Sequence, residues 1–183
     1  MADRQSIEAF LQSQGPVVDV RAPAEFEKGH IPGAKNLPLF SDLERAEVGT
    51  TYKQVGRTAA VQLGLSLVGP KLALLGETLQ EWSSQSPGQP LRIHCWRGGM
   101  RSGSMAWLAE TLDLQAMVLE GGYKSYRRWV LELMEQPWPI HLLGGRTGTG
   151  KTDLLLALAE RGWPSWTWRD WPITAAAALA AWA

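Results

Sequence analysis

The sequence contains a single cysteine, Cys95, among its 183 residues. An intramolecular disulfide is therefore impossible, and the thiol is either buried and inert or chemically employed. A net charge of one sign is also absent, because eighteen basic residues balance eighteen acidic ones. This balance argues against a chain-wide basic surface for nucleic acid, although it leaves room for local basic patches.

Long apolar runs are missing as well. No stretch approaches the roughly eighteen uninterrupted apolar residues of a membrane span, and residues 1–10 lack the basic-then-apolar pattern of a secretory signal. We therefore expect a cytoplasmic protein that does not contact a membrane. An apolar content of 45% is nevertheless enough for a buried core, and the length suggests one domain and the start of a second.

Strand and helix patterns alternate along most of the chain. Short β-branched or apolar runs predict strands, and longer segments with helical apolar spacing predict helices. The predicted strands are 16–21, 34–39, 91–94, 117–119 and 140–143, and the predicted helices are 6–14, 24–28, 42–79, 102–112, 124–134 and 151–161. The segment 42–79, broken at Gly56 and at Gly69-Pro70, has the character of a helical insertion. This alternation predicts an α/β fold with a mostly parallel sheet flanked by helices on both faces.

Composition divides the chain into four parts. Residues 1–135 form the first predicted domain, and the proline-rich residues 136–139 form a linker. Residues 140–162 predict the first strand, loop and helix of a phosphate-loop domain. Residues 163–183 form a tail rich in Trp and Ala, whose composition is unlike that of a parallel strand or an amphipathic helix.

Cys95 directly follows a predicted strand and precedes a glycine-containing loop and a helix. Such a loop aims backbone N–H groups at the sulfur, and the helix N-terminus adds partial positive charge, so the thiol pKa falls below about 8.5. Glycines permit the tight turn, and arginines supply charge-assisted hydrogen bonds. Cys95 is the predicted catalytic residue, and the predicted anion-binding loop comprises Trp96, Arg97, Gly98, Gly99, Met100, Arg101 and Ser102.

A second glycine-rich loop satisfies the phosphate-binding pattern G-x-x-x-x-G-K-[ST] between a predicted strand and a predicted helix. Its residues are Gly145, Arg146, Thr147, Gly148, Thr149, Gly150, Lys151 and Thr152. Backbone N–H groups there can hold a di- or triphosphate, and Lys151 can reach its terminal oxygens. The Thr152 hydroxyl can take a Mg²⁺ ligand position, and we predict no other metal site.

Several segments of the first domain resemble the rhodanese superfamily. They are residues 19–21 with 25–26, residues 29–34, and the strand, cysteine loop and helix around Cys95. A rhodanese-type domain followed by a phosphate loop is similar to the tRNA 2-selenouridine synthases. Residues 36–39, 44–45, 48–54, 95–102 and 119–124 are also similar to patterns of that family, in family order.

The resemblance implies a selenotransferase that replaces sulfur by selenium in the wobble-position 2-thiouridine of tRNA through an S-geranyl intermediate. The implied co-substrates are selenophosphate and geranyl diphosphate, and the implied partners are tRNA carrying 2-thiouridine and an enzyme that produces selenophosphate. Cys95 would be the thiolate nucleophile that handles selenium, and the loop 145–152 would hold the diphosphate. Asp19 and Arg21 would be scaffold residues beneath the cysteine loop.

The tail departs from the family pattern, in which an acidic, glycine-containing segment and a long further domain follow the phosphate-loop helix. If residues 165–179 are encoded by one suitable set of codons, one added nucleotide before codon 165 would convert them into a string that resembles this continuation, so we hypothesise a frameshift. The resemblance thus predicts a C-terminally shortened form whose turnover is in doubt.

Three alternatives stay open at the level of sequence. The spacing of Cys95 and Arg101 also fits cysteine-dependent phosphatases and arsenate reductases of the same fold, and the domain could be a plain rhodanese-fold sulfurtransferase. The chain could also be a non-catalytic anion-binding fragment. For the histidines, we predict a core or hydrogen-bonding role for His94, a structural loop role for His30 and a packed position on a strand for His141.

Overall fold

The computed structural model describes residues 3–137, 141–163 and 165. The chain divides into two compact units, Met1–Trp129 and Val130–Ala183. The division falls inside a helix, Gly122–Met134, whereas the predicted linker 136–139 lies just beyond it and is only partly within the described residues.

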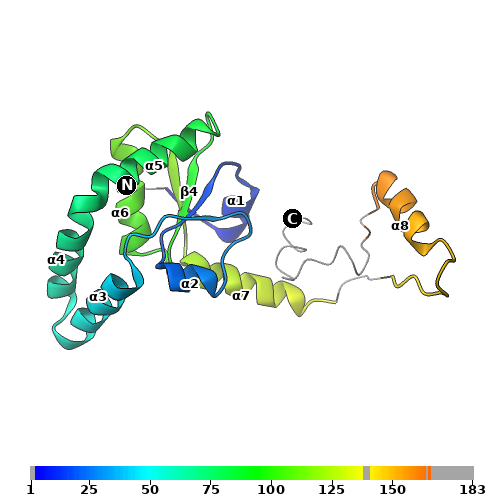
Figure 1. Cartoon of the computed structure of the whole chain (residues 1–183), viewed down its shortest axis with the longest axis horizontal. Helices are drawn as coiled ribbons and strands as arrows, with labels where there is room; N and C mark the ends of the chain where they lie inside the picture. Colours follow the sequence, from blue (N-terminus) through cyan, green and yellow to red (C-terminus); the bar gives the residue numbers. More distant parts are fainter. Residues whose placement is uncertain (1–2, 138–140, 164, 166–183) are drawn as a thin grey trace. The chain divides into compact units, whose positions relative to one another are not determined.

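The first unit is built on a parallel sheet, in which Figure 1 labels β4. The sheet has five strands in the order β1-β5-β4-β2-β3. The strands are β1 (Asp3–Gln5), β2 (Val17–Asp19), β3 (Lys35–Asn36), β4 (Leu91–His94) and β5 (Ala116–Leu119). The predicted parallel α/β sheet is therefore confirmed. The sequence did not predict β1, because its three polar residues carry no apolar alternation and pairing with β5 defines the strand.

The helices agree with the predicted segments to within a few residues. They are α1 (Ile7–Gln12), α2 (Pro23–Glu27), α3 (Asp42–Gln54), α4 (Arg57–Val68), α5 (Leu72–Ser84), α6 (Met100–Thr111) and α7 (Gly122–Met134). The predicted breaks in the insertion are confirmed. Gly56 has a φ of 121°, and Pro70 lies in the short 3-10 turn Gly69–Lys71 between α4 and α5.

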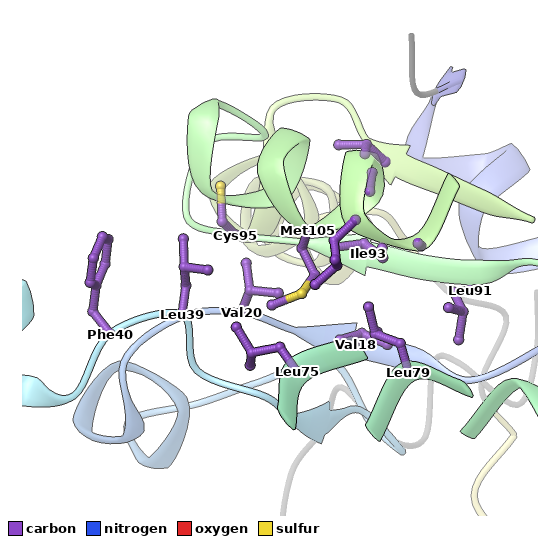
Figure 2. Packing of buried hydrophobic residues seen from close by; sticks show 14 residues of the cluster. Val18, Val20, Leu39, Phe40, Leu75, Leu79, Leu91, Ile93, Cys95 and Met105 are labelled. Carbon is purple, nitrogen blue, oxygen red and sulfur yellow. The ribbon is translucent and has the colours of Figure 1, made fainter. Parts of the chain in front are cut away.

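The main core of the first unit lies on the α5 and α6 side of the sheet. Figure 2 shows buried side chains of β2, β4, α5 and α6 in contact, with Val18, Leu79 and Ile93 fully buried. Cys95 lies at the edge of this cluster, and its sulfur points away from the labelled apolar side chains. Side chains alternate along a strand, so His94 faces the other side, where its ring meets those of Phe10 in α1 and Tyr123 in α7. Helices cover both faces, as predicted.

The run Arg57–Ser84, which comprises α4, the 3-10 turn and α5, is by length and composition apolar enough to cross a membrane, because a window of 18 residues in it has a mean hydropathy of 1.4. Core helices of globular proteins pass the same test, and Leu75 and Leu79 of this run belong to the core described above. Composition alone does not distinguish the two kinds of helix.

The described part of the second unit consists of a loop and α8 (Lys151–Glu160). The predicted strand 140–143 is wrong for the residues that can be described, because His141, Leu142 and Leu143 form no strand. A strand needs a hydrogen-bonded neighbour, and none of the described residues pairs with these. His141 is accordingly exposed and not packed. Of the predicted tail, only Trp163 and Ser165 are described.

Candidate functional site

Cys95 lies at the carboxyl end of β4, where the chain turns through residues 96–99 into α6. Its side chain is buried, with 3% exposed. The sulfur lies 3.3 Å from the hydroxyl oxygen of Ser102, in the first turn of α6. The carboxyl edge of a parallel sheet, next to a helix N-terminus, is the usual position of ligand sites in α/β proteins.

Opposing influences set the pKa of the Cys95 thiol. Burial raises this pKa, while the Ser102 hydroxyl, the backbone N–H groups of Ser102 and Arg97, and the charge of Arg101 lower it. The lowering influences dominate, so the pKa of Cys95 lies below its ordinary value. A thiolate is the nucleophilic form of cysteine, and this environment therefore favours a reactive thiol over an inert one.

Two backbone hydrogen bonds from α7 orient the cysteine loop. The Tyr123 N–H donates to the Cys95 carbonyl at 2.8 Å, and the Lys124 N–H donates to the Trp96 carbonyl at 3.0 Å. The C=O and N–H of one planar peptide point in opposite directions, so these bonds turn the N–H groups of Trp96 and Arg97 to the other side. The Arg97 N–H is one of the groups that lower the Cys95 pKa. The start of α7 thus fixes the orientation of these backbone N–H groups in the cysteine loop.

Two glycines allow this close approach of α7 to the loop. Gly98 and Gly122 have φ values of 62° and 61°, in the left-handed region. A Cβ on Gly98 would lie 2.5 Å from the Leu119 carbonyl oxygen, and one on Gly122 would collide with the Cys95 carbonyl. The sequence predicted Gly98 as a loop residue, but the contact of Gly122 with the loop was missed because it depends on tertiary packing.

Arg101, predicted to bind the anion, is paired with a carboxylate in the structure. Its Nη1 donates to Glu25 Oε2 at 2.8 Å, and Arg45 Nε lies 3.7 Å from the same oxygen. Burial raises the Glu25 pKa, but Arg101, the Ala22 N–H and Arg45 lower it further, so the net pKa of Glu25 is lowered. Sequence reasoning used Glu25 only as part of a motif, because 76 positions separate it from Arg101.

The remaining predicted loop residues surround Cys95 at the surface. Arg97, Gly99 and Met100 are exposed, and Trp96 is half-buried beside Tyr123, with 5.9 Å between the ring centroids. Met100 is the first residue of α6, which begins two positions before the predicted start. The Arg97 side chain is therefore accessible to solvent next to the cysteine loop.

A buried ion pair adjoins the loop through Tyr123. Arg21 Nη2 donates to Asp19 at 2.6 Å and to the Gly29 carbonyl at 2.8 Å, and both charged side chains are fully buried. The Arg21 guanidinium lies 3.9 Å from the centroid of the Tyr123 ring. Because removing one member leaves a buried unpaired charge, this arrangement agrees with the scaffold role expected for both residues.

His94 is fully buried, with its Nε2 3.7 Å from an Asp19 carboxylate oxygen. Burial lowers the pKa of His94 to about 4, although the charge of Asp19 raises it. His94 is therefore neutral near pH 7 and belongs to the core, as predicted. His30 stacks on Phe26, with ring centroids 3.9 Å apart, and its Nδ1 lies 3.1 Å from the Phe26 carbonyl, which agrees with a structural role.

The phosphate loop belongs to the second unit and curls around its own lysine. Lys151 Nζ donates to the carbonyls of Gly145 at 2.8 Å and Arg146 at 2.6 Å, and the Thr149 hydroxyl donates to the Arg146 carbonyl at 2.9 Å. Gly145, Gly148 and Gly150 have positive φ values of 151°, 84° and 71°. The predicted loop and helix are confirmed, and residues 144–150 are exposed.

Residues 3–128 match the family model of the rhodanese-like domain. The chain belongs to the rhodanese-like domain family. It is 44% identical over 162 residues to the tRNA 2-selenouridine synthase of Bordetella bronchiseptica, covering 86% of this chain and 44% of that protein. It is 42% identical over 156 residues to the tRNA 2-selenouridine synthase of Shewanella sediminis, covering 82% of this chain and 42% of that protein. The similarity predicted from motifs is thus confirmed.

The chain spans less than half the length of these curated relatives. A solved structure described as "N-terminal domain of putative ATP/GTP binding protein", from Clostridium difficile 630, is 40% identical, with a TM-score of 0.66. The similarity covers 70% of this chain and 99% of that one. In the rhodanese-like domain, the fold brings together the predicted Cys95, Arg101 and Ser102, while the predicted phosphate loop lies in the other unit.

Proposed function

We propose that this chain carries the selenium-handling part of a tRNA 2-selenouridine synthase, with Cys95 as the thiolate nucleophile. One observation carries the proposal. The thiol with a lowered pKa sits in a loop of inward-turned amides, in a chain that is 42–44% identical to proteins of that name. The chain would accordingly act as a transferase in tRNA modification.

The substrate would be tRNA with 2-thiouridine at the wobble position, and the selenium donor would be selenophosphate. Loop amides, Arg97 and Arg101 would hold the anionic donor beside Cys95. In the S-geranyl route, the uridine sulfur bonds to the geranyl carbon while diphosphate leaves with the bonding electrons. The Cys95 thiolate would attack the phosphorus of selenophosphate, so that a sulfur–phosphorus bond forms while the phosphorus–selenium bond breaks and selenide leaves. The selenide would then bond to the uridine carbon while the sulfur departs with its geranyl group, and water would hydrolyse the phosphorylated Cys95 to release phosphate. The enzyme that produces selenophosphate would be a partner, and the cytoplasm, where tRNA is modified, would be the location.

The phosphate loop would hold the diphosphate of geranyl diphosphate. Its N–H groups and the Lys151 ammonium fit that charge, and Thr152 would supply a hydroxyl ligand to Mg²⁺. A bound Mg²⁺ would neutralise charge that develops on the leaving diphosphate. The Clostridium difficile protein, whose N-terminal domain resembles this chain, is described as an ATP/GTP binding protein, and this description supports a phosphate ligand.

The test is an incubation of the purified chain with tRNA bearing 2-thiouridine, selenophosphate, geranyl diphosphate and Mg²⁺. Mass spectrometry of the tRNA nucleosides should detect S-geranyl and selenium-containing uridine. Cys95→Ser should abolish selenium incorporation, while geranylation should depend on Lys151. Selenium incorporation that survives Cys95→Ser would overturn the assignment of the nucleophile.

The spacing of Cys95 and Arg101 favours a second candidate, a cysteine-dependent phosphatase. A phosphatase needs a protonated general acid beside the leaving oxygen. Glu25 reaches the loop through Arg101, but its lowered pKa keeps it ionised near pH 7. The same preparation should therefore fail to hydrolyse an aryl phosphate, and hydrolysis that Cys95→Ser removes would favour the phosphatase.

A further inference from the structure

The first turn of α3, in the helical insertion, is fixed against two neighbouring elements. Asp42 Oδ1 accepts a hydrogen bond from the Ala24 N–H in α2 at 3.0 Å. Lys71, at the 3-10 turn before α5, donates to both carboxylate oxygens of Glu44. The first contact holds α3 beside α2, the helix that carries Glu25, and the second links α3 to the turn before α5. The proposed function gives this insertion no role.

Arg45 projects from this turn toward the cysteine site. Its Nε lies 3.7 Å from Glu25 Oε2, the oxygen to which Arg101 donates at 2.8 Å. The Arg101–Glu25 pair alone has no net charge, so Arg101 would offer an anion little attraction while paired. Arg45 restores one positive charge to the group. Its side chain is 41% exposed and that of Glu25 is 25% exposed, so an approaching anion can reach the cluster.

Gly49 provides the space in which Arg45 lies. A Cβ built on Gly49 would lie 2.7 Å from Arg45 Nη1. The two residues are four positions apart on α3 and therefore stand one above the other on the same helix face. Glycine weakens a helix interior by about 1 kcal/mol relative to alanine, and a side chain at position 49 would require the end of the Arg45 side chain to move.

We propose that Arg45 is a positioning residue of the cysteine site: it pairs with Glu25 when Arg101 turns toward the anionic donor, and Gly49, which has no side chain, leaves room for it. The inference rests on the proposed function, since it requires an anion to bind beside Cys95. When Arg101 leaves Glu25, the half-buried carboxylate would otherwise lose its closest partner. The insertion thereby tunes the site for a multiply charged, phosphate-like donor.

Sulfate is a suitable probe because it is a tetrahedral dianion that does not titrate near pH 7. The full chain has one cysteine, so the ultraviolet absorbance of its thiolate, with Cys95→Ser as the blank, reports the Cys95 pKa alone. Bound sulfate disfavours the thiolate and raises this pKa, and the rise with concentration gives the sulfate affinity. Sodium chloride at equal ionic strength is the reference.

Arg45→Gln should weaken sulfate binding roughly threefold or more, and Arg45→Lys should restore part of the loss. Arg57→Gln is the matched control, because Arg57 is an exposed arginine of the same insertion that forms no ion pair among the described residues. Gly49→Ala should also weaken sulfate binding, although alanine favours the helix and the melting temperature should not fall. Gly49→Ala changes the position of the Arg45 side chain but keeps its charge, so it tests whether the position matters.

A double-mutant cycle tests whether Arg45 affects sulfate binding through its pairing with Glu25. Glu25→Gln should strengthen sulfate binding, and Arg45→Gln added to Glu25→Gln should have much less effect than it has alone. Equal sulfate affinity in Arg45→Gln and the unaltered chain, or an equal loss in Arg57→Gln, would overturn the inference and leave the proposed function standing. If sulfate leaves the Cys95 pKa of the unaltered chain unchanged, the anion site itself fails, and both proposals fall.

Discussion

Cys95 combines burial, which raises its pKa, with hydrogen bonds and a positive charge that lower the pKa further than burial raises it. The Ser102 hydroxyl is the largest of the lowering influences, and it lies on the first turn of α6. Position alone would not make this thiol reactive. Its acidity depends on one side chain that packs against the sulfur and on amides that the loop aims at it.

Ser102→Ala should raise the pKa of Cys95, because the Ser102 hydroxyl donates a hydrogen bond that stabilises the thiolate more than the neutral thiol. The pH at which alkylation by iodoacetamide reaches half its maximal rate should therefore move upward. Ser104→Ala is the matched control. Ser104 is an exposed serine of the same helix that donates to the Met100 carbonyl and not to the sulfur. An unchanged midpoint in Ser102→Ala would show that the loop amides set the acidity by themselves.

Some residues of the site could be recognised from sequence because their neighbours along the chain define them. Cys95, Arg101 and Ser102 share one loop and one helix start, so a local pattern places them together. Glu25 and Arg45 join the same cluster from α2 and α3. No local pattern links residues so distant in the sequence. From the sequence alone, Glu25 would be predicted to be an ordinary carboxylate exposed to solvent.

At the scale of elements, the start of α7 is as much a part of the site as the start of α6. Gly122→Ala should disturb the cysteine loop, because its Cβ would collide with the Cys95 carbonyl. The Cys95 pKa should rise, and the free energy of unfolding should fall by more than the ~1–2 kcal/mol that left-handed backbone alone costs a residue with a side chain.

Gly33→Ala separates these two effects. Gly33 has a similar φ of 75°, but an added Cβ there meets nothing within 4 Å. In denaturant titrations, Gly33→Ala should therefore lower the free energy of unfolding only by the cost of left-handed backbone. It should leave the Cys95 pKa unchanged. Equal effects of the two substitutions on that pKa would contradict a buttressing role for α7.

The phosphate loop makes a separate prediction at this scale. Lys151→Ala should weaken binding of inorganic pyrophosphate, measured by calorimetry, by roughly tenfold or more, because the ammonium is the loop's point charge for phosphate. The control is Lys53→Ala, which removes a lysine from the last turn of α3. Unchanged affinity in Lys151→Ala would argue against a phosphate ligand at this loop.

Elements could be predicted where the pattern within the segment is strong. The β-branched run at β2 and the breaks at Gly56 and Gly69-Pro70 are of this kind. The polar β1 was missed because only pairing with β5 makes it a strand. Residues 140–143 were wrongly predicted as a strand because their apolar character satisfies the pattern, while the residues described as 141–143 lack a hydrogen-bonded neighbour.

For the first unit taken together, stability should depend on the cluster between the sheet, α5 and α6. Leu79→Ala should lower the free energy of unfolding by about 2–5 kcal/mol, because the side chain is fully buried and leaves a cavity. Leu74→Ala, on the same helix but 66% exposed, should change it by less than about 0.5 kcal/mol. Urea titrations of both variants measure the difference, and similar losses would mean that α5 does not pack as described.

The pairing of β1 with β5 also determines the order in which the domain can be completed on the ribosome. Asp3 is synthesised well before Met117, its partner in the sheet. At typical synthesis rates the N-terminal strand waits on the order of ten seconds before β5 leaves the exit tunnel. During that interval β2, β3 and β4 can pair among themselves, while β1 is an unpaired polar segment. The polar composition of β1, which made the strand hard to predict from sequence, therefore lets the unpaired segment stay hydrated without aggregating until β5 is available.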